Sequence, residues 1–201
     1  EGTIYMVANA GNMIDLQQMK EEGISEEEWK KTTMAMSNGK VVNFFTGSLV
    51  IDGQNQPSQS LTLKRGVARF DLNVDVAGSA AIESLTLKNV AQSGYLFAQG
   101  EVAASPADVE RNDVTAHFDT ALSASTPGVL YVYEQENAGI EVSIEAVIDG
   151  QHKVLTKTLE GNLKRNTIYT VTVRKNDIDI VVKVGIDDWE PGEDTEIIPQ
   201  L

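Results

Sequence analysis

The chain of 201 residues contains no cysteine, which excludes disulfide bonds, thiolate metal sites and cysteine nucleophiles. Basic residues are scarce: 16 Lys and Arg stand against 30 Asp and Glu, for a net charge of −14. Such an acidic surface repels phosphate groups, so we expect no nucleic-acid partner. Apolar runs are only a few residues long, and we therefore expect no segment that spans a membrane as a helix.

Signatures of catalysis and metal binding are also lacking. His117 and His152 have no partner at metal-ligand spacing, and the sequence contains neither a G-x-S-x-G motif nor a phosphate-binding loop. Asp71, Asn73 and Asp75 occupy the first, third and fifth places of a calcium loop, but valine stands where that loop needs glycine. Among 30 acidic residues, a catalytic carboxylate pair cannot be recognised by spacing. We expect no cofactor, no metal and no enzymatic activity.

The sequence does contain many segments in which apolar and polar residues alternate. Phe70, Leu72 and Val74 alternate with Asp71 and Asn73, which is the pattern of a strand with one buried face. The pattern recurs at residues 140–148, 169–174 and 178–184, and shorter strands are expected at 3–8, 47–51, 84–90, 114–118, 129–133 and 153–159. One polar face per strand is typical of antiparallel sheets, so the sequence predicts an all-β fold.

One segment is predicted to be helical, at residues 12–32. Ser25 and Glu28 have the spacing of a capping box, in which each side chain bonds the backbone amide of the other residue. Gly23 separates this turn from an earlier one around residues 14–22. We expect a short helical insertion that covers a sheet.

The segment 98–114 is rich in Ala, Ser, Asp and Asn, a composition typical of linkers. We therefore expect a domain boundary near residue 100, with one β-sandwich over residues 1–100 and a second over residues 101–201. Each half then holds one strand that begins with Leu-Lys-Arg, at Leu63–Arg65 and at Leu163–Arg165. On this interpretation each motif leads into a core strand of its own sandwich.

Five segments together resemble the fimbrillin family of Bacteroidetes, which comprises pilus subunits and associated anchor or tip proteins. They are "YMVANAGN" (5–12), "LKRGVARFDLNV" (63–74), "VYEQEN" (132–137), "LKRNTIYTVTVR" (163–174) and "VGIDDWEPG" (184–192). The resemblance implies two transthyretin-like antiparallel β-sandwich domains in an exported lipoprotein of the outer membrane and cell surface. It also implies assembly by strand donation, in which a neighbouring subunit fills a groove left by the removal of an N-terminal strand.

The chain departs from that family at its start, because no lipid-bearing cysteine or removable strand precedes "GTIYMVANA". We expect an N-terminally trimmed or shorter first domain. At the other end, residues 193–201 are the candidate donor segment, and a solvated tail is the alternative. The residues singled out there are Glu196, Ile197, Ile198 and Leu201.

The predicted function is that of a structural or adhesive fimbrial subunit whose partners are other fimbrial subunits, with host or bacterial surface receptors as further candidates. A surface glycan-binding module without catalytic activity is the alternative. Clustered aromatic residues on one exposed sheet face would favour that alternative, but only 6% of the residues are aromatic. A hydrolase is the third possibility.

Overall fold

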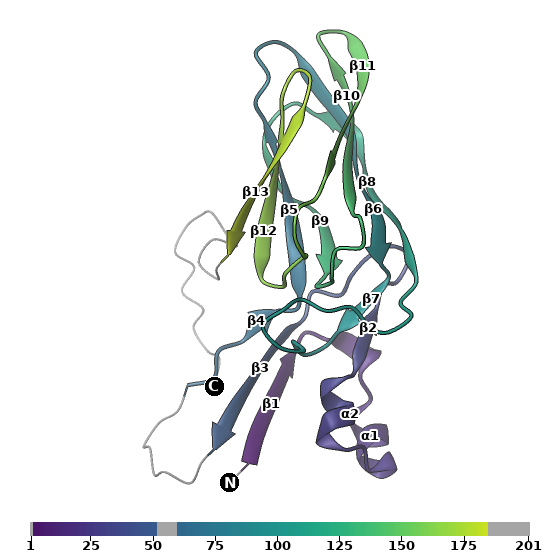
Figure 1. Cartoon of the computed structure of the whole chain (residues 1–201), viewed down its shortest axis with the longest axis vertical. Coiled ribbons are helices and arrows are strands. Elements are labelled where there is room, and N and C mark those ends of the chain that lie inside the picture. The colour runs from purple at the N-terminus through teal and green to yellow at the C-terminus, as the bar shows by residue number, and fades with distance from the viewer. Residues whose placement is uncertain (1, 52–59, 185–201) are drawn as a thin grey trace.

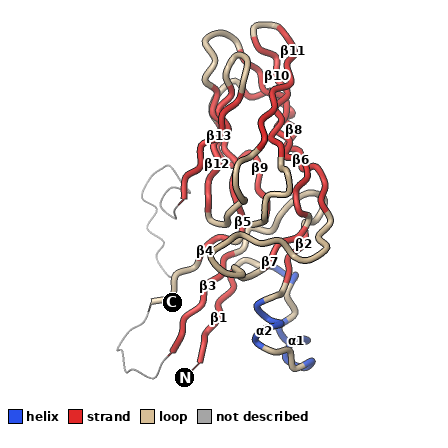
Figure 2. The backbone as a smooth tube through the Cα atoms, in the orientation of Figure 1, coloured by secondary structure: helices blue, strands red, loops and turns tan. Residues whose placement is uncertain are grey.

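The structure is a computed structural model that describes residues 2–51 and 60–184. Most of these residues form strands, and the few helical turns lie close to the N-terminus (Figures 1 and 2). The all-β prediction is therefore confirmed. The elements are β1 (Gly2–Ala8), η1 (Gly11–Met13), α1 (Leu16–Glu22), α2 (Glu26–Lys30), β2 (Thr33–Ala35), β3 (Phe45–Ile51), β4 (Lys64–Arg65), β5 (Val67–Val74), β6 (Ala80–Ala91), β7 (Ser93–Tyr95), β8 (Arg111–Leu122), β9 (Thr126–Tyr133), β10 (Glu141–Ile148), β11 (Gln151–Thr158), β12 (Thr167–Val173) and β13 (Ile178–Val184).

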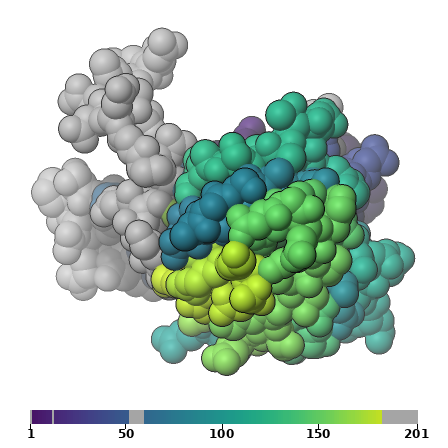
Figure 3. Space-filling view, turned by 90° about the horizontal axis from the view of Figure 1, so that it is seen from above, coloured from purple at the N-terminus to yellow at the C-terminus, as the bar shows by residue number. Residues whose placement is uncertain are grey.

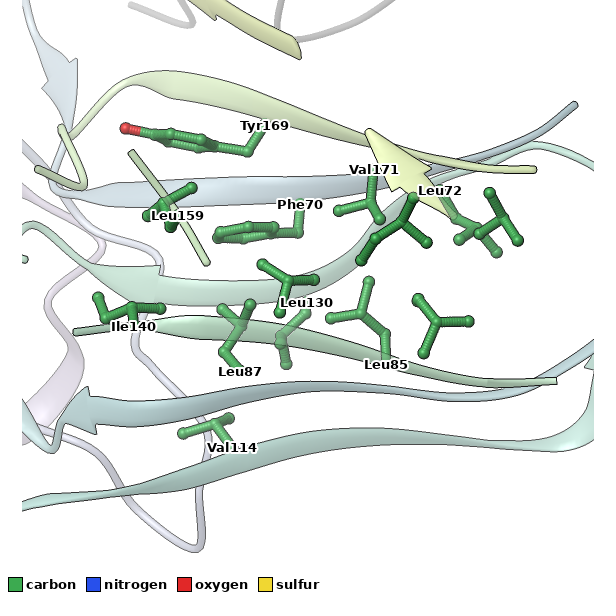
Figure 4. Packing of buried hydrophobic residues seen from close by; sticks show 14 of the residues in the cluster. Phe70, Leu72, Leu85, Leu87, Val114, Leu130, Ile140, Leu159, Tyr169 and Val171 are labelled. Carbon is green, nitrogen blue, oxygen red and sulfur yellow. The ribbon is translucent and has the colours of Figure 1, made fainter. Parts of the chain in front are cut away.

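The larger part of the molecule is a sandwich of two four-stranded sheets. Their strand orders are β11-β10-β6-β8 and β13-β12-β5-β9. The alternating apolar residues of both sheets point inward and form one hydrophobic core (Figure 4). At its centre the rings of Phe70 and Tyr169 stack with centroids 5.1 Å apart. Burial of this apolar surface is the main stabilising contribution to the sandwich.

The expected division near residue 100 needs correction, because both sheets combine strands from either side of it. β5 lies between β12 and β9, and β6 lies between β10 and β8. Seen from above, the segments that precede residue 100 lie side by side with those that follow it in one body (Figure 3). The polar stretch 98–114 lies between β7 and β8 and includes the first four residues of β8. Its composition marks a surface connection, which can join two strands as well as two domains.

The two Leu-Lys-Arg motifs lead into neighbouring strands of a single sheet. β5 and β12 pair in parallel, with Ala68 opposite Thr167. Both motifs therefore lie at the same end of the sandwich, and the expectation of one motif per sandwich was wrong. Alternation alone cannot reveal this pairing, because a strand between two neighbours shows the same period whichever way those neighbours run.

The remaining elements form what we call the N-terminal layer, comprising residues 2–51, 60–65 and 93–97. It contains a three-stranded sheet of order β1-β3-β4, the short β2-β7 pair and the helices (Figure 1). A second, smaller core of buried side chains lies here, at Ala10, Met34, Phe44, Val67, Leu96, Phe97, Tyr133 and Ile168. Val67, Tyr133 and Ile168 come from sandwich strands, so the sandwich completes the core of the layer.

The predicted helical insertion is confirmed at α1 and α2. Ser25 Oγ accepts the Glu28 amide at 3.2 Å, and Glu28 Oε2 accepts the Ser25 amide at 2.8 Å, which completes the capping box. Gly23 ends α1 with φ of +64°, a left-handed conformation that glycine adopts at little cost. Neither helix has a buried residue, and within the described ranges no helix is long and apolar enough to cross a membrane.

Candidate functional site

The junction between the sandwich and the N-terminal layer contains a buried ion pair. Arg165 and Glu134 side chains are only 8% and 10% exposed, and Arg165 Nε lies 3.2 Å from Glu134 Oε1. The guanidinium also donates to the backbone oxygens of Leu96 at 3.0 Å and Tyr95 at 2.9 Å. Burial lowers the pKa of Arg165, and the Glu134 carboxylate opposes that shift. A charged side chain that precedes β12 therefore holds the end of β7 in the layer.

Tyr133 of β9 makes a second polar connection between the two regions. Its hydroxyl donates to the Ala35 carbonyl at 3.2 Å and accepts the Val42 amide at 3.0 Å. Its ring packs against Phe44, with centroids 6.1 Å apart, and burial raises the pKa of its hydroxyl. Arg165 and Tyr133 thus fix the layer on the end of the sandwich.

In the part of the chain that the structure describes, the three-stranded sheet of the layer is covered on one face. Tyr5 and Val7 of β1 pack into the smaller core, and the Tyr5 ring meets Phe97 edge-on at 5.3 Å. On the opposite face, the side chains of Ile4 and Met6 are each 46% exposed. Successive side chains of β1 point to opposite faces of the sheet, so β1 has apolar side chains on both faces, although only one face is covered within the described residues.

The helical segment lies beside β1, on the side away from β3 (Figure 1). Residues of both line a groove between them. Two adjoining hollows of about 530 and 460 Å³ form it, and Tyr5, Leu16 and Trp29 line both. The groove is mostly apolar, and one wall is the outer edge of a strand. Such a groove suits an extended peptide that carries apolar side chains.

The predicted donor segment lies outside the described residues. This applies to Glu196, Ile197, Ile198 and Leu201, and to the whole range 193–201. The proposal of a donor role therefore still rests on sequence alone.

The candidate metal residues have structural partners. Asp71 accepts hydrogen bonds from the Arg69 guanidinium at 2.7 and 2.8 Å, and Asn73 Oδ1 accepts one from Ser125 Oγ at 2.8 Å. His117 is exposed on β8. Among the residues that the structure describes, no group of three or more His, Asp or Glu side chains could hold a metal ion.

Glycan binding would need exposed aromatic rings, but two tyrosines of the sandwich strands are packing residues. Tyr133 and Tyr169 are 0% and 2% exposed, so neither ring offers a surface on which a sugar could stack. The junction itself was missed by sequence reasoning. The second Leu-Lys-Arg motif contains Arg165, but nothing in the sequence pairs it with Glu134.

The fold resembles solved structures at low sequence identity. A candidate cell adhesion protein of Parabacteroides distasonis has a TM-score of 0.62 and 17% identity, over 98% of this chain and 77% of that chain. Another candidate cell adhesion protein, from Bacteroides eggerthii, has a TM-score of 0.58 and 12% identity, over 90% and 76%. The tip fimbrial protein Mfa3 of Porphyromonas gingivalis, with a C-terminal truncation, has a TM-score of 0.56 and 14% identity, over 90% and 78%. At these identities the likeness shows a shared fold.

The family comparison covers almost the whole chain. No curated protein matches the sequence. The model of the family described as fimbrillin-A associated anchor proteins Mfa1 and Mfa2 matches residues 1–195. The match includes the sandwich, the N-terminal layer and all five segments that resemble fimbrillins, so that resemblance is confirmed. The chain belongs to the family of fimbrillin-A associated anchor proteins Mfa1 and Mfa2.

Proposed function

We propose that this protein is a structural or adhesive subunit of a cell-surface fimbria and joins its neighbours by β-strand donation. The observation that carries the proposal is the family match over residues 1–195. The fold shared with a tip fimbrial protein supports it. The partners are other fimbrial subunits, and the protein acts at the outer membrane without catalysis.

On this proposal, a neighbouring subunit supplies what the described residues of the N-terminal layer leave open, namely one edge and one face of its three-stranded sheet. An open sheet has unpaired backbone amides and carbonyls along its edge, and an uncovered apolar face remains in contact with water. A donated strand pairs with the open edge and covers the apolar face. On this proposal the layer becomes a second transthyretin-like domain only when a neighbouring subunit contributes to it.

The donor in this chain is the segment 193–201, with Ile197, Ile198 and Leu201 as apolar side chains and Glu196 directly before them. A strand advances about 3.3 Å per residue, so nine residues span roughly 30 Å, which is enough for one strand. The apolar side chains bury against the acceptor, and the backbone supplies the hydrogen bonds.

Deletion of residues 193–201 tests the donor role. We expect loss of the fimbrial structures that electron microscopy shows on cells producing the full chain, with surface export of the deleted protein unchanged. The matched control, Thr195→Ser with the segment intact, should assemble normally. Normal fimbriae from the deletion variant would refute the donor role, and a strain lacking the gene that still makes complete fimbriae would refute the function itself.

A further inference from the structure

The two sheets of the sandwich meet along two sides, and the sides are closed differently. On one side, Lys157 Nζ of β11 lies 2.7 Å from Asp179 Oδ1 of β13. On the other side the outer strands are β8 and β9, which lie next to each other and leave a pocket of about 440 Å³. We call it the seam pocket. It is lined by residues 115–117 of β8, 129–131 of β9, and 39–41 and 43 of the N-terminal layer.

The wall that the N-terminal layer contributes is held in a fixed position. Residues 37–40 form a two-residue hairpin turn with backbone hydrogen bonds in both directions, 2.9 and 3.0 Å long. Asn38 and Gly39 at its tip have φ of +51° and +68°, the left-handed pair that this turn requires. Further along, the Val42 amide donates to the Tyr133 hydroxyl at 3.0 Å. The wall is therefore formed in advance, so a ligand does not have to order a loop when it binds.

The charge of the seam pocket differs from that of the whole chain. Acidic residues outnumber basic ones by 30 to 16 in the chain, yet Lys40 is the one charged residue of the lining and no lining residue is acidic. Carboxylates lie 2.5 to 2.9 Å from five other lysines, namely Lys30, Lys31, Lys88, Lys157 and Lys175. Lys40 forms no such pair among the described residues. An anionic group in the pocket would supply the partner that Lys40 lacks.

The uncharged polar residues of the lining suit the hydroxyl groups of a sugar. Asn43, Thr115 and His117 are exposed, and each side chain can both donate and accept hydrogen bonds. Tyr131 is partly exposed and combines an apolar ring with a polar hydroxyl. A preformed hollow of several hundred Å³ with a few polar groups among apolar ones is typical of sites for small molecules.

The polar lining continues from the pocket onto the outer face of a sheet. Thr115 pairs with Thr86 of β6, and their hydroxyl oxygens lie 2.9 Å apart. Thr86 pairs in turn with Ser143 of β10, and Ser143 pairs with Thr156 of β11. Paired residues share a face, and neighbouring strands are about 5 Å apart, so this row of hydroxyl side chains spans roughly 15 Å. The row offers a place for the sugars that follow the one in the pocket.

From these observations we infer that the seam pocket binds a saccharide that carries a carboxylate group. Lys40 pairs with the carboxylate, Asn43, Thr115 and His117 bond the sugar hydroxyls, and Tyr131 contacts the sugar ring. The inference goes beyond the proposed function, because it assigns a class of receptor to a surface apart from the donor segment 193–201 and the open edge of the layer. Saccharide binding can therefore fail while fimbriae still assemble.

Calorimetric titration of the full chain tests the ligand class. The probes are 3′-sialyllactose and a hyaluronan tetrasaccharide, which carry carboxylates on different sugars, and lactose, which is neutral. We expect at least one acidic probe to bind about tenfold or more tightly than lactose, because a charge-assisted bond to Lys40 is added. If neither acidic probe binds better than lactose at concentrations up to about 10 mM, the inference is overturned.

Two pairs of variants test the location. Lys40→Met should lower the affinity for the acidic probe about tenfold, to that for lactose, whereas Lys164→Met removes the same charge outside the pocket and should leave the affinity unchanged. Thr115→Ile fills the pocket without a change of charge and should weaken binding of the acidic probe, whereas Thr120→Ile, outside the pocket on β8, should not.

All four substituted side chains are exposed, so thermal unfolding of the variants should match that of the parent chain. An equal loss of affinity in Lys40→Met and Lys164→Met would show attraction by overall charge and would overturn the inference. Unchanged affinity in both Lys40→Met and Thr115→Ile would overturn it as well, because the saccharide would then bind elsewhere.

Discussion

The sandwich and the N-terminal layer solve the burial of apolar surface in different ways. The sandwich closes two sheets over a core of 22 buried residues, whereas the layer has eight, three of them contributed by sandwich strands. Three outer strands of the sandwich, β8, β11 and β13, carry charged side chains and the fourth, β9, carries Pro127, whereas β1 has neither charge nor proline. The sandwich therefore has a hydrophobic core of its own and supports the N-terminal layer. The N-terminal layer depends on the sandwich for part of its core, and among the described residues nothing covers one face or the outer edge of its three-stranded sheet.

The largest expected effect is in the sandwich core. Phe70 is fully buried and stacks on Tyr169, so Phe70→Ala should reduce the free energy of unfolding by about 3–5 kcal/mol. Ile4→Ala in the layer removes a side chain that is 46% exposed and should cost about 1 kcal/mol or less. Urea denaturation followed by circular dichroism measures both. Similar losses would mean that the two regions do not differ in packing as described.

Substitution at the junction between the sandwich and the N-terminal layer should cause the next largest loss of stability. Arg165→Met leaves Glu134 buried without its partner and should lower the free energy of unfolding by about 3 kcal/mol. Arg174→Met removes an ion pair in which the arginine side chain is 44% exposed, and it should lower the free energy of unfolding by less than about 1 kcal/mol. Adding Glu134→Gln to Arg165→Met should recover part of the loss. If the double variant is no more stable than the single one, the buried ion pair is not what joins the regions.

The smallest effect is a pH dependence confined to the layer. Hydrogen bonds from Lys30 and then Tyr5 hold the pKa of Glu26 below its ordinary value of 4.5. A carboxyl group with a lowered pKa stabilises the fold fully above 4.5, and that contribution is lost as pH falls through the lower, folded-state pKa. The helical segment should therefore loosen from β1 in acid before the sandwich unfolds.

Trp29 reports this change, because its ring lies 5.3 Å from Phe97 in the layer. In a Trp189→Phe background, Trp29 is the single remaining tryptophan. Its fluorescence should change below pH 4.5, and Glu26→Gln should abolish that acid transition while leaving circular dichroism unaltered. An identical titration in the Glu26→Gln variant would show that another group controls the contact.

The local features of the fold could be predicted from the sequence, but the global arrangement could not. Alternation from Phe70 to Val74 and at residues 140–148 predicted strands that the structure has at Val67–Val74 and Glu141–Ile148. The spacing of Ser25 and Glu28 predicted α2, because both signals depend on neighbouring residues. The parallel pairing of β5 with β12 joins residues about a hundred positions apart. No local pattern encodes that choice, which is why the boundary near residue 100 had to be corrected.

The same limit applies to the candidate site. The sequence of β1 shows that it lacks charge and proline, but only the topology shows that it is an outer strand with a groove at its side. Likewise, Arg165 was visible as part of a repeated motif, while its contacts with Glu134 and Tyr95 required the folded chain. Which strands lie at a sheet edge, and which residues meet at the junction, is decided by the fold of the whole chain.

Hydrogen–deuterium exchange of β1 in free and assembled protein tests the central claim most directly. If β1 accepts a strand, backbone amides of residues 2–8 that exchange quickly in the isolated chain become protected in the fimbria, while exchange in β11 (Gln151–Thr158) is unchanged. Unchanged exchange in β1, with new protection in β11 or β13 instead, would contradict the account.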